Sequence, residues 1–94
     1  MLTVKQRMAL RSMAMTIRPI YQIGKDGLTN NLIEGISLAL EAHELIKISV
    51  LKTVDAPLKE VAYDLTSATH SELIQIIGRQ IVLYKKSKKQ LIKI

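Results

Sequence analysis

Apolar residues recur at helical spacing in three segments of the chain. The first segment opens with a capping box, Thr3-Val4-Lys5-Gln6. In this motif the Thr3 hydroxyl accepts a hydrogen bond from the Gln6 backbone N–H, and the Gln6 side chain accepts one from the Thr3 backbone N–H. This pattern predicts a helix to about Met15 that has ended by Arg18, because a residue before proline avoids helical geometry. The side chains expected to point inward are Leu10, Met13, Ala14 and Ile17.

The other two helical segments have clear starts and apolar stripes. Thr29 or Asn30 is expected to cap a helix that runs to about His43. The third helix is expected from about Leu58 to Thr69. The residues expected to face inward in these two helices are Leu32, Ile33, Ile36, Leu40, Leu58, Val61, Ala62, Leu65 and Ala68.

Shorter apolar runs predict four strands, over residues 20–23, 45–51, 73–77 and 80–85. Gly78-Arg79 separates the last two, and a glycine at the first central position suits a type II′ hairpin turn. Residues 87–94 form a polar and basic tail that either frays or adds a last strand, and both alternatives stay open.

The predicted order is helix, strand, helix, strand, helix, strand, strand. Strands that alternate with helices require crossovers, and the last hairpin adds an antiparallel pair, so the fold class is α/β with a mixed four-stranded sheet and an additional N-terminal helix. Right-handed crossovers would place the second and third helices on one face of the sheet. The length of 94 residues fits a single domain over residues 1–94.

Charge is distributed unevenly along the chain, which has a net charge of +6. Residues 1–25 carry +5 with no acid, residues 26–78 carry −5, and residues 79–94 carry +6, again with no acid. A fold that brings the two ends together would have one strongly positive side, and such a side attracts polyanions.

The sharpest local feature is Gly24-Lys25-Asp26-Gly27, between a predicted strand and a predicted helix. Glycines let the backbone approach a ligand closely, and a helix start favours a phosphate. Lys25 adds a mobile positive charge. By itself the motif is also explained by a simple turn. The first helix strengthens the phosphate interpretation, because Arg7, Arg11 and Arg18 are expected alongside the loop.

Other chemistry is not indicated. The chain has no cysteine, no nucleotide-binding glycine motif, and no nucleophile with a matching base, so neither an enzyme, a cofactor, a metal site nor a small-molecule substrate is expected. His43 and His70 are interpreted as helix-end residues. Tyr21 and Tyr84 are expected to pack in the core rather than stack on bases. The acids Glu34, Glu41, Glu44, Glu60 and Asp64 are expected on solvated helix surfaces.

Neither a signal peptide nor a membrane span is predicted. The first seven residues lack an apolar core, and the apolar runs are far shorter than the roughly 18 residues that cross a bilayer. We therefore expect a cytoplasmic monomer that does not bind a membrane, although the run Lys85-Lys86-Ser87-Lys88-Lys89 leaves contact with anionic lipid as an alternative to an RNA-binding arm.

Three segments together resemble a known family. They are Gly24 to Thr29, Leu40 to Ile48 and Ile77 to Tyr84, and they are similar to the CRM domain (chloroplast RNA splicing and ribosome maturation), most closely its stand-alone bacterial form, the YhbY family. The resemblance implies a fold like the C-terminal domain of bacterial translation initiation factor three, preceded by an extra helix. It also implies RNA binding through the Gly-x-x-Gly loop and nearby basic residues, with association to precursors of the large ribosomal subunit.

The leading hypothesis is an accessory factor of ribosome assembly whose partner is ribosomal RNA or a pre-ribosomal large-subunit particle. Asp26 is expected to orient the loop through a turn hydrogen bond. A DNA-binding chromatin-type protein and a protein-interaction adaptor remain as alternatives. The residues expected at the RNA-binding site are Gly24, Lys25, Asp26, Gly27, Lys5, Arg7, Arg11, Arg18, Arg79, Lys85 and Lys86.

Overall fold

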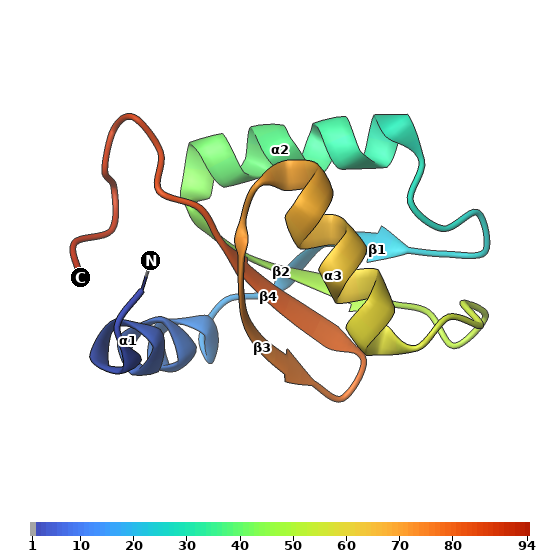
Figure 1. Ribbon diagram of the computed structural model, residues 1–94, viewed down its shortest axis with the longest axis horizontal. Coiled ribbons are helices and arrows are strands. Elements are labelled where there is room, and N and C mark those ends of the chain that lie inside the picture. Colours follow the sequence, from blue (N-terminus) through green and yellow to red (C-terminus); the bar gives the residue numbers. More distant parts are fainter. Residues whose placement is uncertain (1) are drawn as a thin grey trace.

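The computed structural model describes residues 2–94 and contains the predicted elements in the predicted order (Figure 1). The elements are α1 (Val4–Ala14), β1 (Pro19–Ile23), α2 (Asn30–His43), β2 (Leu45–Val50), α3 (Leu58–Thr69), β3 (Glu72–Ile77) and β4 (Gln80–Tyr84). The Thr3 capping box is present, and Thr29 is the residue that caps α2.

The four strands form one mixed sheet in the order β1-β2-β4-β3. β1 and β2 are parallel and are joined through α2, whereas β4 is antiparallel to both β2 and β3. Gly78 at the β3–β4 turn has a φ of 56°, a backbone geometry that favours glycine. The predicted fold class is therefore confirmed.

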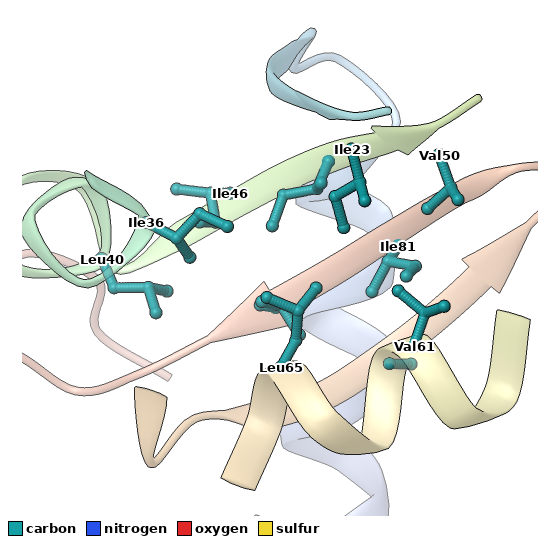
Figure 2. Close-up of a cluster of buried hydrophobic side chains, with 11 residues drawn as sticks. Ile23, Ile36, Leu40, Ile46, Val50, Val61, Leu65 and Ile81 are labelled. Carbon is teal, nitrogen blue, oxygen red and sulfur yellow. The ribbon is translucent and has the colours of Figure 1, made fainter. Parts of the chain in front are cut away.

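The main core lies between the sheet and the pair α2 and α3, which cover the same face as predicted (Figure 2). Every second residue of a strand points to this face, and each helix contributes one apolar stripe. The buried members of this helix-side core are Ile23, Ile36, Leu40, Ile46, Ile48, Val50, Val61, Ala62, Leu65, Ile81 and Leu83.

The opposite face of the sheet is covered by α1 over part of its area. Leu10 and Ala14 of α1 are buried against apolar side chains of the strands, and Ile17 packs beside them. Met13 was expected inward, but 40% of it is exposed, because it lies at the margin of this contact. The strand residues in this second core are Leu45, Ile74, Val82 and Tyr84.

Glu44 contradicts the prediction of a solvated carboxylate, because it is completely buried. It follows α2 with a φ of 65°, which turns the chain sharply into β2. Its Oε2 accepts from the backbone N–H and the hydroxyl of Ser87, at 2.7 and 2.6 Å, and its Oε1 accepts from the Ile92 N–H at 2.6 Å. Burial alone would raise the pKa of Glu44, but these hydrogen bonds outweigh it and lower the pKa to about 2.

The tail after β4 adds no strand to the sheet. It is instead held by Glu44, with Ser87 buried and Ile92 packed against the α1 side of the sheet. Gln6 of α1 also donates to the Ile94 carbonyl at 3.4 Å. The two basic ends of the chain therefore lie together.

Candidate nucleic-acid interface

The Gly24–Gly27 loop is a tight turn at the end of β1. The Gly27 N–H donates to the Gly24 carbonyl at 2.9 Å, and Gly27 has a φ of 69°, where a side chain would strain the backbone. Lys25 and Asp26, at the tip, are both exposed. Thr29 then begins α2, and its hydroxyl accepts from the Leu32 N–H at 3.1 Å. The turn thus presents one lysine and an open stretch of backbone to solvent.

The 51–57 connection lies beside this loop, and the β3–β4 turn lies beside the 51–57 connection. The Leu51 N–H donates to the Ile23 carbonyl at 2.9 Å, which places the 51–57 connection next to Gly24. At the β3–β4 turn, Nε and Nη2 of Arg79 donate to the carbonyls of Val50 and Leu51, at 2.9 and 2.7 Å. We call these three connections, residues 24–27, 51–57 and 78–79, the loop end of the molecule.

The cations at the loop end are Lys25, Lys52 and Arg79. Lys52 is exposed and was missed by the sequence reasoning. Its position follows from the parallel pairing of β1 and β2, because parallel strands end at the same edge of a sheet. The predicted strand–helix–strand order was compatible with this pairing but did not specify that the two strands are direct neighbours. Arg79 was a predicted site residue, and its hydrogen bonds fix its guanidinium beside the loops.

The expectation that Arg7, Arg11 and Arg18 lie alongside the loop is wrong. Figure 1 shows α1 and the loop at opposite ends of the long axis of the molecule. Arg18 directly precedes β1, and the Gly24–Gly27 loop directly follows β1. The length of that strand therefore separates Arg18 from the loop. The physical reason is that α1 packs on the far end of the sheet through Leu10 and Ala14.

Arg7 and Arg11 attach α1 to the edge strand β3. Nη1 of Arg7 donates to the Leu73 carbonyl at 2.9 Å, and Nη2 pairs with Glu72 at 3.1 Å. Nε of Arg11 donates to the Ile74 carbonyl at 3.4 Å. Both guanidinium groups therefore have a structural role in addition to any contact with a ligand.

The remaining predicted cations lie with α1 and the tail, which we call the terminal end. Lys5, Arg18 and Lys86 are on the surface, and Nζ of Lys85 donates to the Thr69 carbonyl at 3.1 Å. Lys85, Lys86 and Lys93 help to line a cavity of about 500 Å³ between the tail and the start of β3. The predicted basic residues are thus divided between two regions rather than gathered in one.

The histidines and tyrosines were assigned correctly in most respects. His70 is the left-handed C-cap of α3, with a φ of 54°, and His43 is the last residue of α2. Tyr84 is buried and Tyr21 packs against the helix-side core, as predicted.

Between residues 2 and 94 we find no group of three or more histidine, cysteine or acidic side chains able to hold a metal ion. None of the helices in this part of the chain is long and apolar enough to cross a membrane.

Comparison with known families identifies the loop, the strand β2 and the hairpin as parts of one domain type. A family model described as the CRS1/YhbY (CRM) domain matches residues 2–85. The chain belongs to this family. The match ends just after β4, so the tail residues Ser87 and Ile92, which bind Glu44, lie outside the CRM domain model.

Individual relatives are similar over nearly the whole chain. The “Probable RNA-binding protein YqeI” of Bacillus subtilis is 50% identical over 88 residues, which cover 94% of this chain and 92% of the relative. The “RNA-binding protein” of Haemophilus influenzae is 31% identical, covering 92% and 87% of the two chains. The solution structure of SAV1595 from Staphylococcus aureus is 51% identical, with a TM-score of 0.80 and coverage of 94% and 92%.

Proposed function

We propose that this CRM-domain protein binds RNA and serves as an accessory factor in assembly of the large ribosomal subunit, where it contacts ribosomal RNA or its precursor. The relatives named as RNA-binding proteins support the first part of the proposal. The observation that carries the site is the loop end, where Lys25, Lys52 and Arg79 come from three different connections. The part in ribosome assembly rests on the family resemblance.

The loop end is suited to holding a phosphate of the RNA backbone. At Gly27 no atom lies within 4 Å of where a Cβ would stand, so the main chain is open to a ligand there, whereas the Leu51 side chain packs against Gly24. Lys25 supplies a flexible charge, and the fixed guanidinium of Arg79 supplies a second positive group whose position is set before binding. Asp26 shares the turn and opposes a close approach of phosphate on its own side. The loop therefore positions RNA and does not by itself select a sequence.

The terminal end adds long-range attraction to whatever phosphate contacts its cations make. Lys5, Arg18, Lys86 and the other tail lysines form an exposed positive region on the same molecule. Such a field raises the rate of encounter with a polyanion and is weakened by salt.

Neutralising Lys25 should weaken RNA binding more than neutralising a lysine elsewhere. We expect Lys25→Ala to lower the affinity for a structured ribosomal RNA fragment by about five- to tenfold and to reduce the slope of log K against log salt by about one. Lys93→Ala is the matched control, since it removes the same charge from the exposed tail. Fluorescence anisotropy over a salt series measures both quantities. Equal effects of the two variants would remove the loop from the mechanism.

The assembly role is tested by gradient sedimentation of cell extract with crosslinking of bound RNA. Co-migration with large-subunit precursors and crosslinks to their RNA are the expected result. A purely free pool without ribosomal RNA crosslinks would contradict the proposal. If large complexes survived nuclease treatment, a protein adaptor would be the better explanation.

A further inference from the structure

A strip of polar side chains lies on the part of the sheet that α1 leaves uncovered. The register places Gln22 of β1 beside Ser49 of β2, Ser49 beside Gln80 of β4, and Gln80 beside Ile77 of β3. Gln75 is paired with Val82 one row further toward α1. We call Gln22, Ser49, Gln75 and Gln80 the polar strip.

Alternation along the strands shows which face these residues share. Tyr21 and Ile23, on either side of Gln22, both pack in the helix-side core, so Gln22 points to the other face. The same argument holds for Ser49, whose neighbours Ile48 and Val50 are core residues. Gln22 is exposed, and the other members of the polar strip are half-buried. Their amide and hydroxyl groups are therefore accessible beside one another.

The charge around the polar strip favours an anionic partner. Along the strands of the described chain the only acidic residue is Glu72, which is paired with Arg7 at the α1 margin. Arg11, which is exposed, bonds to β3 at the same margin, and Lys47, in the next row of β2 toward α1, is largely buried and adds its charge from beneath the surface. No acidic side chain of a strand thus opposes a phosphate that approaches this face.

The polar strip also lies between the two basic regions. Ser49 precedes Val50, whose carbonyl holds Arg79 at the loop end. Leu45, four residues back along β2, is packed under α1. At about 3.3 Å per strand residue, Leu45 lies roughly 13 Å along β2 from Ser49, while Gln75, at the other side of the strip, adjoins Ile74, which is itself packed under α1. An RNA chain held at the loop end that extends toward α1 along this face must cross the strip.

We propose that the polar strip contacts the unpaired bases of RNA whose phosphates are held at the loop end and beside α1. This inference rests on the proposed RNA-binding function. A carboxamide offers two donors and an acceptor, which match the hydrogen-bonding edges of bases in single-stranded loops. Because no tyrosine of the described chain belongs to the strip, recognition here works by hydrogen bonds rather than by stacking. The apolar Ile77, 44% exposed, supplies a base-contacting surface at one edge.

The decisive variant is Gln22→Glu, which keeps the size of the side chain and places a negative charge in the strip. The matched control is Ser67→Glu, since Ser67 is exposed on α3 away from this face. The probe is a hairpin RNA with an unpaired loop, compared with the same strand closed into a full duplex. We expect Gln22→Glu to lower hairpin affinity at least about fivefold, while Ser67→Glu changes it less than about twofold. Equal losses in the two variants would overturn the proposal.

A second measurement removes any ambiguity from altered folding. In the unmodified protein, the side-chain amide NMR signals of Gln22, Gln75 and Gln80 should shift on titration with the hairpin, and shift less with the duplex. Unmoved signals at saturating hairpin would overturn the proposal even if Gln22→Glu binds weakly. Lys25→Ala separates the proposed function from the base contact at the polar strip. If Lys25→Ala weakens hairpin binding while Gln22→Glu does not and the glutamine signals stay unmoved, RNA binding at the loop end is supported and the polar-strip proposal is overturned. If the protein binds neither RNA, both fail.

Discussion

Glu44 shows how a single side chain can fix a distant part of the chain. A buried carboxylate is costly unless donors surround it, and here the donors come from Ser87 and Ile92 in the tail. Since the pKa is about 2 in the folded protein against an ordinary 4.5, the ionised form is the one that the fold stabilises. The tail is therefore bound through a charge that persists at neutral pH.

Replacing Glu44 should destabilise the fold and change its response to acid. Glu44→Gln leaves one acceptor for donors that now use two oxygens, and we expect a loss of about 2–3 kcal/mol. In the unmodified protein the stabilisation is complete above the ordinary pKa of 4.5 and is lost as the pH falls toward 2, by an amount on the order of 3 kcal/mol.

Urea unfolding at several pH values between neutral and the pKa measures both effects. Glu41→Gln is the control, since Glu41 is exposed on the same helix. A Glu44→Gln protein whose stability falls with acid as steeply as that of the unmodified protein would show that this carboxylate does not carry the effect.

At the level of elements, α1 is an attached helix rather than part of the main core. It packs on the sheet through a small apolar cluster and through the bonds of Arg7 and Arg11 to β3. Arg7→Ala removes a hydrogen bond and an ion pair that are half-exposed, so we expect only about 1 kcal/mol of lost stability.

The consequence of Arg7→Ala should be local. Hydrogen exchange in residues 4–14 should accelerate several-fold, while exchange in β2 and β4 stays nearly unchanged. Lys5→Ala, an exposed cation on the same helix, is the control and should leave exchange unaltered. Uniform acceleration over the whole sheet would mean that α1 is integral to the main core.

The sequence was sufficient for the elements because their signals are local. The stripe from Leu58 to Thr69, the Thr3 capping box and the glycine at residue 78 each predict structure from neighbouring residues alone. The bonds of Glu44 and Arg7 were missed, since their partners lie 43 and 65 residues away in the chain. The same limit applies to the Gly24–Gly27 loop. Its turn could be predicted from its own residues, but the 51–57 connection beside it depends on the pairing of β1 with β2.

At the scale of the whole molecule, the positive charge is divided between the loop end and the terminal end. The molecule measures 35 × 24 × 22 Å, and the two ends lie along its longest dimension (Figure 1). They should therefore act independently on a polyanion that spans both, since sites with no shared contact contribute additively.

Additivity can be measured with Lys25→Ala, Lys5→Ala and the double variant. We expect the losses in binding free energy to sum within about 0.3–0.5 kcal/mol. The slope of log K against log salt should fall by about one for each lysine that contacts phosphate. Binding to one long RNA fragment at several salt concentrations provides the data. A double variant no weaker than Lys25→Ala alone would indicate that the RNA does not reach α1.

The Glu44 contact also has a consequence for the order in which the protein forms during synthesis. Glu44 emerges from a translating ribosome before Ser87 and Ile92, which follow it by 43 and 48 residues. Until then its carboxylate lacks the donors that compensate for burial. Burying Glu44 at the turn from α2 into β2 is therefore unfavourable before the tail is present. The contact between Glu44 and the tail is thus made only after residues 87–92 have left the ribosome, so a nascent chain that stops short of them should lack this contact.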